Sequence, residues 1–489
     1  LFPSIAYAKD SRIEYSKDNI LNYFLGVISS NQNNTSEAFK YFNKVQSLKN
    51  SHVNYNIQFI RTLVLLGKFN QAFNFSKEIW SKDEYLFEVD LLLGLESFVK
   101  GDYLTAKKYF ERINRISPYN LYFSDFFGNI LLAWNSASNN NIKDSFKFFE
   151  KIPDRYENLK QIQSIFLQCH FDNPLTQSTF EQLVSKESLG FSRYNYFLAN
   201  YLLFKNKKEE ARKIINLSAK THSSNILLRQ TANFFSTGDI NKIKKLFNCK
   251  NPRDVLAEVF YIIANLYSTE KDYQSSNFYL KISFFLNNKF TPNKTLIGEN
   301  FFYQKKYEES EEVYNSIKSI GPVYSWYASR SLAAILLETK GKKYATSNLE
   351  NEFNLLSNPN FKHYYDLANF FKDNNYHEKS IKYYSLALKN IQQDHPLVSK
   401  IYDRRGTSYE RFGDWERAEK DLTQSLRLSP DQPHVLNYLA YSWVEKGINI
   451  NKALEMLEKA NKLRENDGYI IDSLGWAHYV NKNYSDAKI

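Results

Sequence analysis

The chain contains little glycine, proline or cysteine for its length. Its 489 residues include 15 Gly, 11 Pro, 2 Cys and a single Met. Architectures with many strands need frequent tight turns, and Gly and Pro supply most of them. The scarcity of both residues therefore favours helices over a β-sandwich or barrel. The chain is also too long for one ordinary core, which indicates several domains or one extended array.

The sequence shows no pattern of metal ligands and no long apolar run. Cys169 and Cys249 are far apart and form no CxxC motif, so they indicate neither a zinc site nor a disulfide framework. The eight histidines are scattered, without HExxH. No apolar stretch approaches the roughly 20 residues that cross a bilayer. We therefore expect no metal, no cofactor and no transmembrane segment.

The charge is mildly basic. Lys plus Arg less Asp plus Glu gives 64 − 53 = +11 over the whole chain. Runs such as KNKKEEARK (residues 205–213) mix both signs, as the exposed face of a helix does. No recognition motif for nucleic acid accompanies the charge, so we expect no nucleic-acid partner. A basic scaffold for an anionic envelope polymer stays open as an alternative.

The stretch YDRRGTSYERFGDWERAEKDLTQSLRLSP, residues 402–430, contains two small residues, Gly406 and Ala418, twelve positions apart. Tyr409 follows the first by three, Leu422 follows the second by four, and Pro430 ends the stretch. Two helices cross closely only where small residues meet, with larger side chains filling the groove around them. The pattern predicts two antiparallel helices that cross at Gly406 and Ala418.

Small residues twelve positions apart recur along the chain. The other pairs are Gly26/Ala38, Gly94/Ala106, Ala133/Ser145, Ala199/Ala211, Ala264/Ser276, Gly298/Ser310, Ala333/Ala345, Ala368/Ser380 and Gly475/Ala487. Ile60/Ala72 keeps the spacing with a larger first residue, and Ala440/Ala453 has one extra residue. Successive second members are 34 residues apart from Ala38 to Ala72 and 35 apart from Ser310 to Ala345. The period is that of a helical repeat.

This skeleton, G-x2-Y…A-x3-F…P at a period of about 34 residues, resembles the tetratricopeptide repeat. The resemblance implies an all-α protein, an α-α superhelix of roughly 13–14 helix-turn-helix repeats with an extended concave face. We predict an N-terminal array at residues 9–154, divergent helical repeats at 155–250 and a C-terminal array at 251–489. The last helical pattern stops short at Ile489, so we expect it to be incomplete.

The C-terminal third carries a narrower resemblance. VLNYLAYSWVEKG (435–447) and NKALEMLEKANKLRENDGYIIDSLGWAHY (451–479) are similar to repeats in envelope-associated proteins of Gram-negative bacteria. Some relatives with this pattern are outer-membrane lipoproteins that act as adaptors for a periplasmic protease and its cell-wall hydrolase substrates. The resemblance implies an adaptor whose partner is a periplasmic protease or cell-wall enzyme. This chain lacks the lipobox cysteine of those relatives.

The first residues indicate export. The chain opens LFPSIAYAKD, and Ala6-Tyr7-Ala8 has the small-x-small form of a signal-peptidase site. We interpret residues 1–8 as the remnant of a secretory signal and expect a periplasmic protein. If that interpretation is wrong, a cytoplasmic location follows.

A binding surface is expected on the first helices of residues 400–480. In this repeat, fixed positions of the first helix usually line the concave groove, where amides, arginines and aromatic rings can hold a peptide. The predicted partner-binding residues are Lys400, Asp403, Arg404, Asn437, Tyr438, Tyr441, Asp472 and Trp476. Arg405, by contrast, takes the place of a buried leucine, so we expect its guanidinium to pair with a carboxylate.

Three functions are consistent with these patterns. The first is a non-catalytic adaptor of the bacterial envelope, because the repeats run along the chain and the sequence contains no GxSxG, no GxxxxGK[ST] and no metal cluster. The second is the repeat arm of an enzyme whose catalytic domain follows Ile489. The third is the basic scaffold for an anionic polymer. We favour the first, and expect that the chain itself is not an enzyme.

Overall fold

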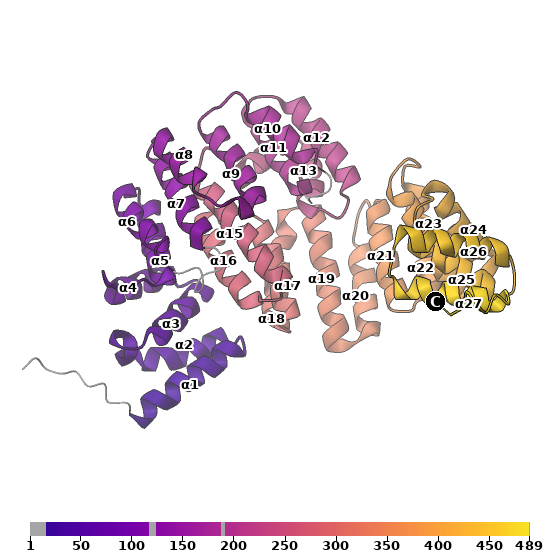
Figure 1. Ribbon diagram of the computed structural model, residues 1–489, viewed down its shortest axis with the longest axis horizontal. Helices are drawn as coiled ribbons and strands as arrows, with labels where there is room; N and C mark the ends of the chain where they lie inside the picture. Colours follow the sequence, from indigo (N-terminus) through magenta and orange to yellow (C-terminus); the bar gives the residue numbers. More distant parts are fainter. Residues whose placement is uncertain (1–15, 117–123, 187–190, 489) are drawn as a thin grey trace, which may run out of the picture. The chain divides into compact units, whose positions relative to one another are not determined.

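The computed structural model describes residues 16–116, 124–186 and 191–488, and all regular secondary structure in these ranges is helical. Residues 1–8, the expected signal remnant, lie outside them. Thirteen α-helical pairs follow one another in the described chain, and a single helix, α27, comes after them (Figure 1). We call the two members of each pair its first and second helix, and α27 corresponds to a first helix. The prediction of an all-α solenoid with roughly 13–14 repeats is confirmed.

The helices are short and regularly paired. The pairs up to α14 are α1 (Lys17–Asn31) with α2 (Thr35–Lys44), α3 (Val53–Leu65) with α4 (Phe69–Ile79), α5 (Phe87–Val99) with α6 (Tyr103–Ile113), α7 (Ser124–Ser138) with α8 (Ile142–Glu150), α9 (Glu157–His170) with α10 (Thr176–Val184), α11 (Tyr194–Phe204) with α12 (Lys208–Thr221), and α13 (Ile226–Thr237) with α14 (Ile240–Leu246).

The later pairs continue the series. They are α15 (Pro252–Thr269) with α16 (Tyr273–Leu286), α17 (Pro292–Tyr303) with α18 (Tyr307–Ile317), α19 (Pro322–Lys340) with α20 (Lys342–Asn354), α21 (Phe361–Asp373) with α22 (His377–Asn390), α23 (Leu397–Phe412) with α24 (Trp415–Leu428), α25 (Pro433–Glu445) with α26 (Ile450–Leu463), and finally the single α27 (Gly468–Val480).

Small residues found in the sequence lie at the helix–helix contact within the pairs, as two hydrogen bonds show. Ser145 donates its hydroxyl hydrogen bond to the carbonyl of Ala133 at 2.9 Å, and Ser310 does the same to Gly298 at 2.8 Å. Both serines are fully buried. Because each bonded partner lies twelve residues earlier, the spacing read from the sequence is the helix–helix contact itself.

The turn within each pair contains a residue with positive φ, and glycine is not required there. Asn33, Lys271 and Lys305 adopt this conformation between their helices. A non-glycine residue in the left-handed region costs free energy, which asparagine tolerates best. The extra residue expected before Ala453 is present, because Gly447 and Asn449 both have positive φ in that turn. The low glycine content is therefore compatible with a turn in every repeat.

The chain divides into two compact units, Leu1–Tyr324 and Ser325–Ile489, with the boundary inside α19. In the first unit one hydrophobic cluster of buried residues runs from Ala38 to Ile297. In the second, separate clusters centre on α21–α22 and on α25–α26. No helix of the described chain is both long enough and apolar enough to cross a membrane.

Three first helices of the first unit are buried on all sides. Every residue is buried along 87–95 of α5, along 126–137 of α7 and along 194–203 of α11. A helix that is buried all round lies inside a core instead of at a surface. In this unit these three helices therefore lie inside the core and do not line an open surface.

The helices α15 and α16 fill the inner side of the first unit. The Phe127 ring of α7 lies 5.9 Å from Phe260 of α15 and 5.6 Å from Tyr279 of α16, measured between centroids. The guanidinium of Arg61, on α3, sits 5.2 Å above the ring of Phe278. The early repeats therefore bury their inner face against later helices of the same chain.

A buried ion pair adds to this closure. Arg193 contacts both oxygens of Glu258 on α15, at 3.1 and 2.5 Å, and the Tyr194 hydroxyl donates to the same carboxylate at 3.2 Å. Burial raises the pKa of Glu258 to about 7, although Arg193 and Tyr194 act in the opposite direction. Removing one partner of such a pair leaves a buried charge without compensation, which is strongly destabilising.

The two cysteines form a disulfide, which the sequence did not indicate. Cys169 of α9 and Cys249, between α14 and α15, have Cα atoms 6.0 Å apart, within the range that a disulfide requires. Their separation of 80 residues carries no spacing signal. Only the packing of α9 beside the start of α15 brings the two thiols together.

We predict that Gly94→Ala destabilises the first unit, whereas Gly475→Ala at the same repeat position does not. A Cβ at Gly94 would overlap the fully buried Phe110 ring, while at Gly475 the nearest atom is the Ala487 carbonyl at 3.5 Å. Overpacking costs about 1–3 kcal/mol, and the second change gains up to about 1 kcal/mol of helix propensity. Denaturant unfolding followed by circular dichroism measures both. Equal effects would contradict the close crossing at Gly94.

Reduction of the disulfide is expected to lower the stability of the first unit by about 2–4 kcal/mol, because the cross-link restricts the unfolded chain. The Cys169→Ser, Cys249→Ser double variant should match the reduced protein, and reductant should leave that variant unchanged. Thermal unfolding with and without reductant gives the comparison. A wild-type midpoint that does not move under reduction would refute the cross-link.

Candidate peptide-binding groove

The predicted partner-binding residues lie on three first helices of the second unit. Lys400, Asp403 and Arg404 are on α23, Asn437, Tyr438 and Tyr441 are on α25, and Asp472 and Trp476 are on α27. On α23 the small residue Gly406 lies against α24, and on the single α27 Gly475 lies nearest the Ala487 carbonyl. The side chains opposite these small residues form a common inner face. We call this inner face of α23, α25 and α27 the groove.

The α23 part of the groove is polar and half-buried. Asp403 is buried and its carboxylate lies 3.3 Å from Nε2 of His434 on the next first helix. Arg404 has a buried Nε with no hydrogen-bond partner among the described residues. Burial lowers the pKa of Arg404, but Tyr365 and Tyr384 raise it and the net shift is upward. Lys400 is exposed beside this group.

The α25 part connects the neighbouring helices. The Tyr438 hydroxyl donates to Oε2 of Glu410 at 2.7 Å, and burial together with this bond raises the pKa of Tyr438. The side-chain oxygen of Asn437 is buried and has no partner within the described chain. A buried amide oxygen without a partner costs free energy, so a bound donor such as a peptide N–H would relieve it.

The α27 part is aromatic and open. Trp476 is 41% exposed and stacks on Tyr479 with centroids 5.4 Å apart and planes 16° from parallel. Asp472, Trp476 and Tyr479 line a shallow hollow of about 600 Å³. Tyr441 on α25 is 39% exposed, and its pKa is raised by burial, by Glu445 and by Asp472. Rigid, half-exposed rings of this kind provide contact area at low entropic cost.

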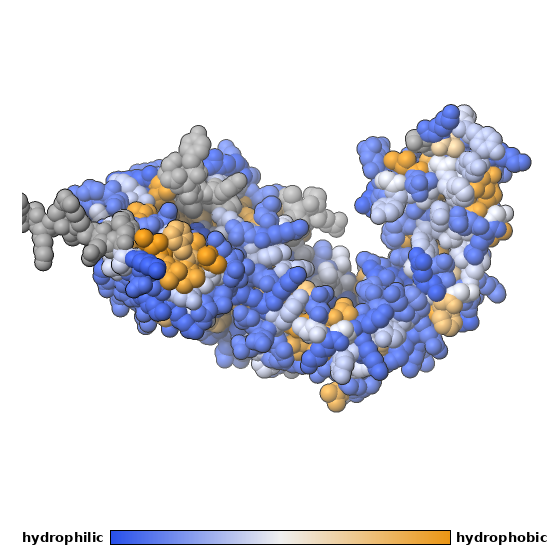
Figure 2. All heavy atoms as spheres, turned by 90° about the horizontal axis from the view of Figure 1, so that it is seen from below, coloured by the Kyte–Doolittle hydropathy of each residue, from blue (hydrophilic) through white to orange (hydrophobic). Residues whose placement is uncertain are grey.

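The structure brings these residues together in neighbouring groups. Asp403 meets His434, Tyr441 lies near Asp472, and Trp476 and Tyr479 form one stack. The assignment of the eight residues to partner binding stays a prediction. Most of the surface visible in Figure 2 is hydrophilic, with apolar side chains gathered in a few patches.

Arg405 confirms the register on which the groove rests. Its Nε lies 2.6 Å from Oδ2 of Asp421, a second nitrogen lies 2.9 Å from Oδ1, and a third bonds the Ser385 hydroxyl at 2.9 Å. The Arg405 side chain is 17% exposed and that of Asp421 is 6% exposed. The expected packed arginine with a carboxylate partner is therefore present, on the side of α23 that faces α24.

The fold is that of a helical-repeat scaffold for protein–protein interaction. A family model of the tetratricopeptide repeat matches residues 21–52. A TPR repeat-containing protein of Pseudomonas aeruginosa is 30% identical over 121 residues, 25% of this chain and 20% of that protein, so the chain spans about a fifth of that relative's length. Together with the helical pairs, these matches support a tetratricopeptide-repeat protein.

Solved structures with a related outline have little sequence in common with the chain. Yeast Tom70 is 13% identical, with a TM-score of 0.41 over 96% of this chain and 90% of that one. Pseudomonas aeruginosa pilF is also 13% identical, with a TM-score of 0.30 over 48% of this chain and 89% of that one. TM-scores this low indicate nothing about a groove or a partner of this chain.

Proposed function

We propose that the protein is a non-catalytic adaptor of the bacterial cell envelope that holds an extended peptide segment of a partner in the groove. Tetratricopeptide repeats indicate a protein–protein interaction scaffold, and this fold is typically non-catalytic. The observation that carries the proposal is the contrast between the two inner faces. The inner face of the first unit is filled by α15 and α16. The groove of the second unit instead offers exposed rings, and polar atoms without partners among the described residues.

The groove suits a peptide better than a folded surface or a small apolar ligand. Asn437 presents a buried acceptor, Arg404 presents a buried donor, and Trp476 offers a flat ring surface. An extended peptide has both a backbone N–H and a C=O at every residue, and it can place an acidic group near Arg404. By analogy with the relatives described above, the partner is a periplasmic protease or a cell-wall enzyme.

The disulfide supports location in an oxidising compartment. Structural disulfides persist in the periplasm and at cell surfaces but are rare in the cytoplasm, where thiols are kept reduced. The Cys169–Cys249 bond joins segments of one packed unit and is mostly shielded, because both cysteines are buried. This agrees with the expectation of a periplasmic protein.

Changing Arg404, Tyr441 and Trp476 together to Ala should weaken peptide binding by about 10- to 100-fold, as loss of several central contacts does. Peptides selected on the wild-type protein from a displayed library provide the probe, and fluorescence anisotropy measures their affinity. The matched control changes Arg427, Tyr344 and Leu463 to Ala, which are exposed on second helices of the same unit. Equal loss in both triple variants, or in neither, would refute the groove.

For the compartment, we expect both cysteines to be oxidised in a Gram-negative host that expresses the complete gene. After acid quenching and maleimide labelling, peptides that contain Cys169 or Cys249 should carry no label before reduction and one label each after it. The Cys169→Ser variant is the control and should label once, at Cys249, without reduction. Two labels on the wild-type chain before reduction would contradict an oxidising location.

A further inference from the structure

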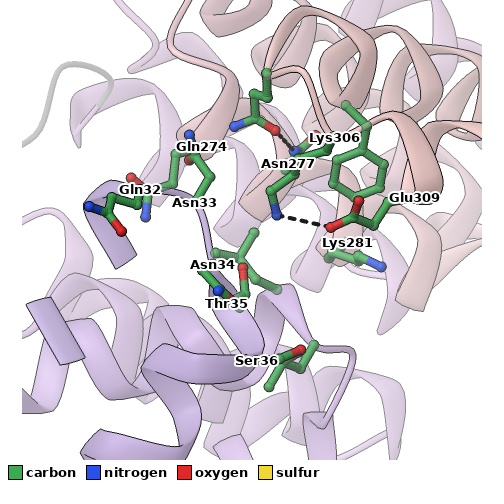
Figure 3. A pocket seen from close by; sticks show the side chains of 14 residues that line it. Gln32, Asn33, Asn34, Thr35, Ser36, Gln274, Asn277, Lys281, Lys306 and Glu309 are labelled. Carbon is green, nitrogen blue, oxygen red and sulfur yellow. Dashed lines mark hydrogen bonds and ion pairs between the residues drawn. The ribbon is translucent and has the colours of Figure 1, made fainter. Parts of the chain in front are cut away.

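A polar cavity lies where the first unit closes on itself. Its volume is about 400 Å³, which is within the usual range of small-molecule sites. The turn between α1 and α2 forms one side, and residues of α16 and of the α17–α18 pair form the other (Figure 3). More than 200 residues separate the two sides in sequence, so the cavity exists only because the unit is closed.

Side-chain amides dominate the lining. Six of them face the cavity, and they are Gln32, Asn33, Asn34, Gln274, Asn277 and Gln304. Each carries a donor and an acceptor, and can therefore bond a hydroxyl group in either sense.

Part of this amide set is fixed in place by other residues. Asn277 donates to Gln304 at 3.2 Å and accepts from Asn300 at 2.8 Å, while Gln274 donates to the Ser30 hydroxyl at 3.1 Å. The side chains of Gln32 and Asn33 make no hydrogen bond within the described chain and stay available to a ligand.

One cation in the cavity has no counter-charge. Lys281 lies on the same face of α16 as Gln274 and Asn277, three to four residues apart along the helix. Among the described residues its ammonium has neither an ion pair nor a hydrogen bond, and burial lowers its pKa. Lys281 is half-buried. A partly desolvated charge without a partner is costly, so a structure that retains one gains when an anion binds.

The neighbouring charges leave the cavity with an excess of one positive charge. Lys306 and Glu309 lie 3.5 Å apart and compensate each other. Lys281 is thus the group that selects the ligand's charge, and it favours a single negative charge. Phe301 adds a ring face, whereas only Leu65 and Leu66 contribute aliphatic surface.

We propose that this cavity binds a sugar acid, a small polyhydroxylated molecule with one carboxylate, by pairing the carboxylate with Lys281 and the hydroxyls with the amides. An apolar ligand would find too little aliphatic surface, and it would bury the amides without partners. A phosphate dianion would meet only one uncompensated cation. The site lies entirely in the first unit and does not depend on the groove of the second unit. An experiment can therefore refute one of the two proposals without affecting the other.

Isothermal titration calorimetry on the full chain with its disulfide intact tests the site, with D-glucuronate, D-glucose and inorganic phosphate as probes. We expect glucuronate to bind at least about tenfold more tightly than glucose or phosphate. Lys281→Met keeps the aliphatic stem and removes the charge, so it should make the affinities for glucuronate and glucose equal. Gln32→Ala removes a hydroxyl partner and should weaken both sugars by a similar factor.

Two controls separate binding from folding. Lys213→Met changes an exposed lysine of α12 in the same unit and should leave all affinities unchanged. Lys281→Met should unfold at the same temperature as the wild type or higher, because it removes a half-buried charge without a partner among the described residues. No heat with glucuronate, a phosphate affinity equal to that of glucuronate, or a preserved preference in Lys281→Met would each overturn the proposal.

Discussion

The close crossing of two helices at a pair of small residues is the contact on which the whole protein depends. A serine hydroxyl reaches the carbonyl twelve residues earlier, at Ser145 and again at Ser310, and larger side chains at the same positions would hold the helices apart. Once each pair is fixed in this way, its larger side chains must pack on the next pair. Stacking then follows, because no single pair can bury its apolar surface alone.

The same repeat produces two different inner faces. In the first unit α5, α7 and α11 are buried on every side, and α15 and α16 complete a closed core. In the second unit Tyr441 and Trp476 remain exposed on their first helices. In the first unit these inner residues pack against further helices of the same chain, whereas in the second unit polar groups and partly exposed rings remain on the face.

The charged groups follow the same division. Arg405 faces the second helix of its pair and makes two hydrogen bonds to Asp421 and one to Ser385, so it has a structural role. Its neighbour Arg404 faces the groove with a buried nitrogen that has no partner. Lys281 holds a comparable position in the cavity of the first unit. Unsatisfied groups of this kind are costly in a folded protein, and both occur where a ligand could contact them.

The sequence by itself determined the helical pairs, their approximate number, the small contact residues and the need of Arg405 for a carboxylate partner, because each depends on neighbours within about one repeat. The largely apolar stretch FEVDLLLGL of α5, with apolar residues on more than one face, was a readable sign of a closed core that the periodic pattern hid. Only the tertiary structure decided the Cys169–Cys249 bond, the filling of the first inner face and the cavity around Lys281. Those features join segments 80 or more residues apart, and the way a solenoid curves back on itself is the sum of small rotations between pairs that no local spacing records.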